Sequence, residues 1–261
     1  DNEHYTTLTV ASQKHIGVNF TSAELTMQLD DFAERVLKPR ISQLASSIDA
    51  DVANAYKNIY ASVGTPGTTP STSLVLLQAQ QKLNEAAAVM SPRYATVNPA
   101  ANAGLVEGMK GLFNPTDTIS KQFRNGMMGT GVLGFDEINM SQSIKQHTTG
   151  NFPVSPIVSS SATFVEGQST LAITFTSGTK TVKQGDVFTI AGVYAVNPQT
   201  RESTGSLQQF VVTADNSVTS GTSMTLAISP ALYTSANALA TVDSFPAQSA
   251  VITFLGSAST Q

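Results

Sequence analysis

The sequence contains one motif with the spacing of a nucleotide-binding loop. The stretch GTGVLG at residues 129–134 matches G-x-G-x-x-G, whose backbone amides hold a pyrophosphate when the turn follows a strand and opens a helix. Here KQFRNGMM precedes the motif, an extended pattern follows it, and no acidic residue stands about twenty positions on to bind a ribose. We therefore expect a flexible loop at 129–134 and no cofactor.

The histidines offer no arrangement typical of a metal site or of nucleophilic catalysis. His4, His15 and His147 are the only ones, and none is three or four positions from another ligand type on a predicted helix. The chain has no Cys, which excludes disulfides and thiolate ligands, and it has no G-x-S-x-G motif. The sequence therefore predicts no zinc site and no serine hydrolase.

Four aspartates deserve the same test. Asp49 and Asp51 are two positions apart on a predicted helix, so they point to different faces and form no carboxylate pair. Asp186 and Asp215 fall in turns between predicted strands, where we interpret them as turn-forming carboxylates, with a calcium site as the second alternative. We expect no catalytic, cofactor-binding or metal-binding residues, and no enzyme.

Composition narrows the classes of partner. The 261 residues carry a net charge of −4, which gives no electrostatic basis for gripping nucleic acid, and no run of eighteen apolar residues could span a membrane. Only 12% of the residues are charged, against about 25% in typical soluble domains. Two interpretations stay open: a surface that is cheap to desolvate and suits burial against neighbours, or a β-rich domain with Thr-heavy strands.

A long amphipathic helix is the main element expected in the first part of the chain. It should lie within the stretch Leu25–Tyr60, with Asp30 and Asp31 at its start and Gly64 and Pro66 after its end. Pro39 lies well past the first turn and should kink or split the helix. Apolar residues follow one another at steps of three, four or five: Phe32, Val36, Ile41, Leu44, Ile48, Val52, Tyr56 and Ile59. We expect this stripe to be core, partner-binding, or both, and Val52→Asp to destabilise the subunit.

Shorter elements surround this helix. Residues 5–20 alternate as a strand does, with a bend at 12–14, and residues 21–24 form a capping box. A second helix should cover 73–90, and residues 94–101 should form a strand that runs into a turn at Asn98-Pro99. A short helix is expected from Leu105 to Phe113, a Gly-rich loop at 114–134, and an extended segment at 135–150.

From about residue 151 the pattern becomes that of an all-β unit. Runs at 161–167, 169–178, 186–197, 207–214 and 223–229 alternate with Gly, Pro, Asn and Asp turns, which describes a small antiparallel barrel or sandwich. Its predicted core residues are Phe175, Phe188, Ile190, Phe210, Val212 and Leu226. A last strand at 250–256 is expected to rejoin the helical part instead of extending the barrel.

The sequence of the predicted helix and of the segment before it resembles that of a known protein family. Residues 15–56 contain a phrase Leu-Thr-x-x-Leu-Asp-Asp-Phe at 25–32 and a proline at 39. They resemble the major capsid proteins of tailed bacteriophages with the Hong Kong ninety-seven fold. Residues 96–101 (TVNPAA) and 134–150 extend the resemblance, and 185–213 are similar to the insertion domain of the short-tailed-phage branch.

The resemblance implies an α+β phage capsid fold with an inserted all-β barrel. It assigns 1–21 to the return strand of a long hairpin (the E-loop), 22–63 to the peripheral-domain spine helix, 64–150 to the axial domain, 151–241 to the barrel and 242–261 to an axial-domain strand. It also implies that copies assemble into an icosahedral shell around non-specifically bound double-stranded DNA, with scaffolding and portal proteins as partners. Assembly would take place in the host cytoplasm, the product would be the virion, and no membrane would be involved.

Relatives carry an N-terminal arm before the first strand and further segments after the last one, so we interpret the chain as a fragment of such a subunit. One alternative function stays open. The Thr- and Ser-rich barrel could be a surface module that binds glycan or protein. We expect the barrel, residues 151–241, to fold independently, because its strands are contiguous in sequence.

Overall fold

The computed structural model describes residues 10, 13–17, 19, 21, 33–109 and 129–259. The chain divides into two compact units, residues 1–54 and 55–261. The capping box at 21–24 and most of the strand expected at 5–20 lie outside the described residues, as do Leu112 and Phe113. The described residues 13–17 take no strand conformation.

The described residues of the first unit belong mainly to the expected helix. A π-helical turn, η2 (Ala33–Leu37), leads directly into α2 (Lys38–Ala53), and a 3-10 helix, η3 (Asn54–Asn58), follows across the unit boundary. Pro39 stands in the first turn of α2, where its missing N–H leaves no hydrogen bond unmade. Leu37 keeps helical φ and ψ of −76° and −48°, so the helix changes type before Pro39 without the break that a split would require. The helical segments end at Asn58, short of Gly64.

The apolar stripe of α2 is not part of a core. None of the residues of α2 is buried, and Val52 is 69% exposed. The expectation that Val52→Asp destabilises the subunit through a buried charge is therefore wrong for the single chain, because an aspartate there would stay in water. Periodicity reported correctly that one face is apolar, but it carries no information on what covers that face.

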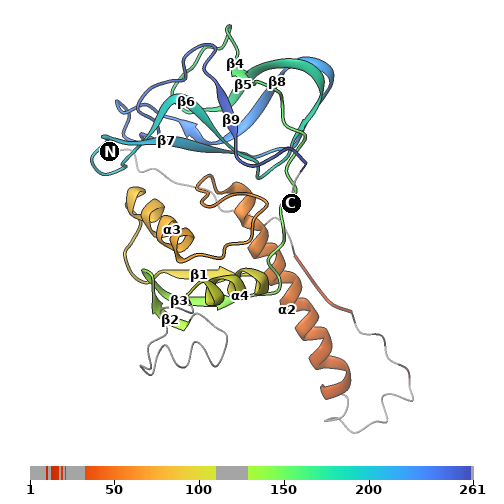
Figure 1. The fold of residues 1–261 in the computed structure, drawn as a ribbon. Helices are drawn as coiled ribbons and strands as arrows, with labels where there is room; N and C mark the ends of the chain where they lie inside the picture. Colours follow the sequence, from red (N-terminus) through yellow and green to blue (C-terminus); the bar gives the residue numbers. More distant parts are fainter. Residues whose placement is uncertain are drawn as a thin grey trace, which may run out of the picture. The chain divides into compact units, whose positions relative to one another are not determined.

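The second unit opens with a small helix-and-sheet layer (Figure 1). Helix α3 (Ser73–Glu85), strand β1 (Tyr94–Val97) and helix α4 (Pro99–Gly108) precede the hairpin β2 (Gly129–Val132) and β3 (Phe135–Met140). The sheet order is β1-β3-β2, with β1 parallel and β2 antiparallel to β3. The helix expected at 73–90 and the strand expected in 94–101 are confirmed, although α3 ends at Glu85 and β1 at Val97.

Helix α4 begins where the sequence indicated a turn. The Asn98 side chain accepts a hydrogen bond from the Ala101 amide at 2.7 Å, and Pro99 occupies the first helical position. An Asn-Pro pair can start a turn or a helix. Here a helix forms, because the apolar residues that follow are buried against the sheet. The buried cluster between helices and sheet consists of Leu76, Leu105, Met109, Phe135 and Ile138.

Most of the second unit is a six-stranded antiparallel barrel. Its strands are β4 (Ile157–Val158), β5 (Gln168–Val182), β6 (Val187–Val196), β7 (Ser203–Val212), β8 (Asn216–Leu232) and β9 (Ile252–Phe254). They follow the order β4-β5-β8-β7-β6-β9. An antiparallel bridge between Ile157 and Val251 joins the two ends of this order, and the Val158 amide donates to the Ala250 carbonyl at 2.9 Å. The bridge closes the sheet on itself.

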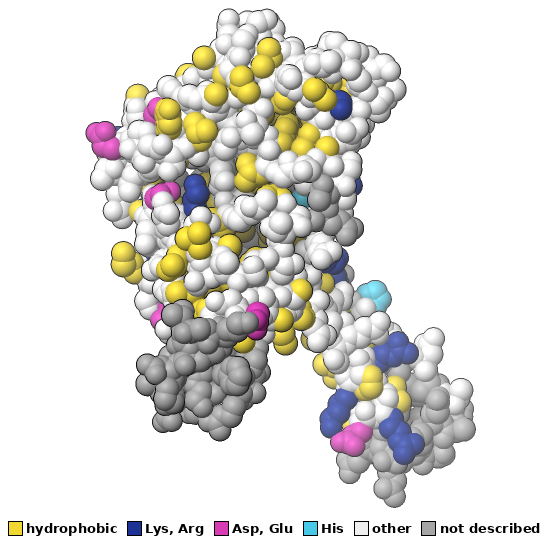
Figure 2. Space-filling view, viewed as in Figure 1, with side chains coloured by type: hydrophobic (Ala, Val, Ile, Leu, Met, Phe, Trp, Pro, Cys, Tyr) yellow, Lys and Arg dark blue, Asp and Glu magenta, His cyan; other side chains and the backbone are white. Residues whose placement is uncertain are grey.

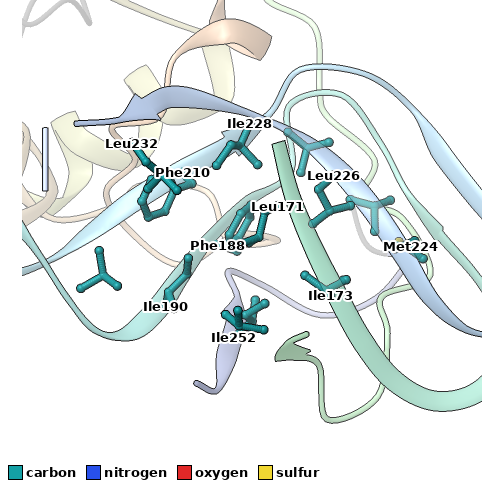
Figure 3. Packing of buried hydrophobic residues seen from close by; sticks show 14 of the residues in the cluster. Leu171, Ile173, Phe188, Ile190, Phe210, Met224, Leu226, Ile228, Leu232 and Ile252 are labelled. Atoms are coloured by element: carbon teal, nitrogen blue, oxygen red, sulfur yellow. The ribbon is translucent and has the colours of Figure 1, made fainter. Parts of the chain in front are cut away.

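The barrel core agrees with the sequence pattern. All six predicted core residues are buried, and Phe188, Ile190, Phe210, Val212 and Leu226 are completely so. Figure 3 shows the labelled side chains from β5, β6, β7, β8 and β9 converging on one interior. The expected strand at 161–167 is wrong: that segment is irregular, and Phe164 reaches the core from it by stacking on Phe245.

The last strand lies elsewhere than expected. Strand β9 pairs with β6, with Ile252 opposite Ile190 and Phe254 opposite Phe188. Phe254 also stacks on Phe152 with ring centroids 4.5 Å apart. The expectation that 242–261 forms an axial-domain strand is therefore wrong. Without β9 the exposed edge of β6 would be left unpaired, which a closed barrel avoids.

We predict that residues 151–259 fold by themselves and that residues 151–241 do not. The shorter fragment lacks β9, the bridge to Ile157 and the buried Ile252 side chain, so its core would open to water. Two-dimensional amide spectra of the two fragments measure this directly. A well-dispersed spectrum from 151–241 would show that the barrel does not depend on its closing strand.

We also predict that Gly108→Ala destabilises the subunit by about 1–3 kcal/mol. In α4, a Cβ on Gly108 would overlap the Ser71 carbonyl oxygen, and one on Gly104 would lie 2.8 Å from the Pro70 carbonyl oxygen. Both obstacles are backbone atoms, so the loop at 70–72 would have to move. Urea unfolding followed by circular dichroism gives the free energy. Gly178→Ala is the control, because its Cβ would meet only the end of Lys180 at 3.6 Å. Equal stability of the two variants would contradict the packing.

Candidate assembly surface

The exposed side of α2 is a continuous apolar face. Leu37, Ile41, Ile48 and Val52 are all exposed, and their spacing of four, seven and four places them on one side of the helix, with Leu44 half-buried between them. Asp51 forms an ion pair with Lys14 and Glu34 one with Lys38. Exposed pairs of this kind contribute at most about 1 kcal/mol, so the apolar face is the distinctive feature of α2.

The second unit also exposes apolar side chains. Leu74 and Leu77 on α3 are 59% and 43% exposed, Val89 and Met90 lie exposed in the segment that leads to β1, and Tyr94 lies exposed at the start of β1. Figure 2 shows a face on which Lys, Arg, Asp and Glu side chains are sparse and yellow apolar side chains recur. Such a surface has a small desolvation penalty when another protein covers it.

The G-x-G-x-x-G motif forms a β-hairpin. Strand β2 carries its first residues, and Leu133 and Gly134 make a two-residue turn into β3 with φ of 52° and 82°. Positive φ at both positions is the geometry that matches the twist of a hairpin. The expected flexible loop at 129–134 is therefore wrong. The motif is followed by a strand, so it lacks the helix N-terminus that a dinucleotide site needs.

The three histidines lie in different surroundings. His4 lies outside the described residues, and His15 is exposed. His147 is placed with its Nε2 atom 2.8 Å from the Oδ1 atom of Asp186. Within residues 33–109 and 129–259 no three His, Asp or Glu side chains gather as metal ligands. In the same part of the chain no helix has the length and apolar character to cross a membrane.

Of the two turn aspartates, Asp186 accepts an amide of its own turn, as the sequence predicted, whereas Asp215 accepts one from a different turn. Asp186 is 1% exposed, and its Oδ2 atom accepts hydrogen bonds from the amides of Lys183 at 2.7 Å and Gly150 at 3.2 Å. Asp215 is exposed, and its Oδ1 atom accepts the Gln184 amide at 2.7 Å. The sequence did not reveal that Asp186 also binds residues 147 and 150, because those partners are far away along the chain.

Tyr56 packs against the same histidine. The ring centroids of Tyr56 and His147 lie 6.0 Å apart in an edge-to-face arrangement. Burial raises the pKa of the Tyr56 phenol above its usual value of 10.0, because the charged form is poorly solvated there. A groove of about 570 Å³ opens beside this cluster, and the Thr- and Pro-rich loop at 64–70 lines it. Its lining presents mainly hydroxyl, amide and methyl groups.

Comparisons with known proteins bear on what this surface is for. A solved structure described as "CUS-3 coat protein I-domain" is 30% identical over 42% of this chain and 98% of that chain, with a TM-score of 0.26. No curated protein matched. A family model described as "P22 coat protein - gene protein 5" matches residues 5–261. The match spans nearly the whole chain, so the chain belongs to the P22 coat protein family and is a structural subunit of a tailed-phage capsid.

Proposed function

We propose that copies of this chain form an icosahedral shell around double-stranded DNA and that the apolar face of α2 is covered by another copy in that shell. The observation that carries the proposal is the face itself: Leu37, Ile41, Ile48 and Val52 share one side of a helix without a buried residue. Membership of a coat protein family supplies the identity of the covering partner, because such proteins assemble with copies of themselves.

The energetics of this contact suit a shell. Completely burying an Ile, Leu or Val side chain is worth about 1.5–3 kcal/mol, and these four are already partly covered, so each adds on the order of 1 kcal/mol. A contact of this strength is modest for one pair of subunits. Repeated through closed symmetry, it contributes to every subunit of the particle.

The remaining partners follow from the same proposal. Scaffolding and portal proteins would act during assembly in the host cytoplasm, and the packaged DNA would be bound without sequence preference. The net charge of −4 provides no overall attraction to phosphates, so contact with the packaged DNA would be weak and non-specific. The subunit would act through geometry and not as an enzyme. Family membership favours this structural function over the alternative of a glycan-binding module.

The proposed domain division also follows, with one change. Residues 22–63 would belong to a peripheral domain, 64–150 to an axial domain, and the inserted barrel would extend from 151 to about 259. The β9 pairing supports the new boundary, because residues 252–254 complete the barrel. The E-loop assignment of residues 1–21 stays a prediction.

The double substitution Ile41→Asp with Val52→Asp tests the α2 face. We expect the yield of shells to fall at least tenfold, because two carboxylates would be desolvated at the contact. The stability of the unassembled subunit should change by less than about 0.5 kcal/mol, because both side chains are exposed there. Electron microscopy after expression with the phage's own assembly partners measures the first quantity, and urea unfolding measures the second.

The matched control places the same charges on the opposite side of α2. At about 100° per residue, Gln43 and Ser46 lie far from the apolar face, and both are exposed. Gln43→Asp with Ser46→Asp should leave shell yield near that of the wild type. A loss of subunit stability in the first variant would instead mean that the face is covered within the subunit. A normal yield of shells from the Ile41→Asp, Val52→Asp variant would show that α2 takes no part in the contact between copies.

A further inference from the structure

Three chain segments that are distant in sequence come together around Asp186 and His147. Its Oδ1 atom binds His147 at 2.8 Å, and its Oδ2 atom accepts the amides of Gly150 and Lys183. Lys183 belongs to the turn between β5 and β6, whereas His147 and Gly150 belong to the segment that enters the barrel. The third segment is η3, where Tyr56 packs its ring edge-to-face with His147.

Local turn formation does not account for this arrangement. The Lys183 amide, three residues before Asp186, is the only donor that belongs to the turn itself. Burying a carboxylate is unfavourable unless several donors replace water, and Asp186 has three. Two of these, His147 and Gly150, come from outside the turn that Asp186 terminates. The desolvated carboxylate therefore depends on the entering segment for its partners.

The surrounding packing is equally close. Gly185 has a φ of 98°, and a Cβ there would lie 3.2 Å from both the His147 ring and the Lys57 side chain. Lys57 and Lys183 are the cationic residues nearest in sequence to this contact, and Asp215 is the other carboxylate at this end of the barrel. Beside Gly185, the side-chain amide of Gln184 donates a hydrogen bond to the side-chain oxygen of Asn58 at 3.0 Å. Turn 183–186 thus contacts η3 and residues 147–150 at once.

A second set of side-chain hydrogen bonds between the barrel and another segment involves β7. The side-chain amide of Gln209 donates to the Ser62 carbonyl and accepts from the Ser62 amide, both at 3.0 Å, as a neighbouring strand would. The three-stranded sheet and the barrel share no strand pairing among the described residues. Side-chain hydrogen bonds, together with the backbone bond from the Ser259 amide to the Gly150 carbonyl, therefore hold residues 56–62 and 147–150 on the barrel in place of a continuous sheet.

We propose that Asp186 and His147 form a clasp that fixes the barrel on the segments flanking it, so that the subunit presents one defined shape to its neighbours. The consequence for assembly rests on the proposed function, whereas the clasp itself is a property of the single subunit. His147 and Asp186 are positioning residues in this scheme. When the clasp opens, residues 147–150 and η3 leave the barrel turn while the barrel core stays closed.

Hydrogen exchange on the full-length soluble subunit tests the clasp without any assembly. In His147→Phe we expect the peptides covering 146–151 and 54–58 to exchange at least tenfold faster than in the wild type. The Phe ring keeps the packing on Tyr56 but removes the donor to Asp186. Peptides from β6 and β7, which contain the buried Phe188 and Phe210, should exchange at the wild-type rate. Unchanged exchange at 146–151 would overturn the proposal.

Asp186→Asn provides a second route, and Asp243→Asn is its control. Asp243 also accepts a backbone amide, that of Tyr194 at 2.9 Å, but this bond lies within residues 151–259 and ties no outside segment to the barrel. We expect faster exchange at 146–151 only in Asp186→Asn. Should Asp186→Asn fail to fold, His147→Phe decides alone, since it leaves the buried carboxylate and both backbone donors in place. Faster exchange throughout the barrel in His147→Phe would show that the pair serves core stability instead, and would contradict the clasp.

Assembly of the same variants separates the two proposals. If the clasp fixes the shape that the subunit needs for assembly, His147→Phe should give aberrant or fewer particles, while the stability of the subunit stays close to that of the wild type. Normal particles together with fast exchange at 146–151 would confirm the clasp and overturn its role in assembly. If wild-type subunits form no shells under any condition, the proposed function fails, and the exchange result still stands.

Discussion

The closing of the barrel constrains most of the second unit. Residues 250–254 fill the gap between β6 and β4, and through them the two ends of a six-stranded sheet are joined. Closure also brings the two ends of the barrel segment together: the Ser259 amide donates to the Gly150 carbonyl at 2.9 Å, and the Thr149 hydroxyl donates to the Ser257 carbonyl at 2.8 Å. A domain whose ends are adjacent can be inserted into another domain without distorting it. The insertion that the family resemblance implies is therefore physically reasonable for this barrel.

Patterns that depend on neighbours in sequence were predictable. Alternation along β6 and β7 identified Phe188, Ile190 and Phe210 as core, because one face of each strand is buried and the period of a strand is two. Pro39 indicated where the long helix would be irregular, because proline lacks an N–H and fits best in a first turn; the change from π-helix to α-helix lies there. Both rules act within a few residues, so no knowledge of the fold was needed.

Choices between distant partners were not predictable in the same way. Strand β9 has the composition of any buried strand, and only the open edge of β6 determines where it pairs. Residues 161–167 looked like a strand, but the barrel already has its neighbours for β5 in β4 and β8, so this segment crosses the core as a loop held by Phe164. The glycines at 129–134 suit a flexible loop and a hairpin turn equally well. Only the pairing of β2 with β3 shows that Gly134, with its positive φ, belongs to a hairpin.

The apolar face of α2 and the buried Asp186 contact, to which the two proposals assign a part in assembly, differ in chemistry, and this difference explains why the sequence indicated only the first. The apolar face of α2 repeats every three or four residues, so the sequence indicates a partner without saying whether that partner is the same chain. The Asp186 contact has no repeat, since a single carboxylate collects donors from segments that meet only after the barrel closes. Apolar faces can be covered by any complementary neighbour, whereas a buried carboxylate accepts only donors placed by the fold. Within one subunit, the polar ties are therefore suited to fixing shape, and the apolar faces are left to join one copy to the next.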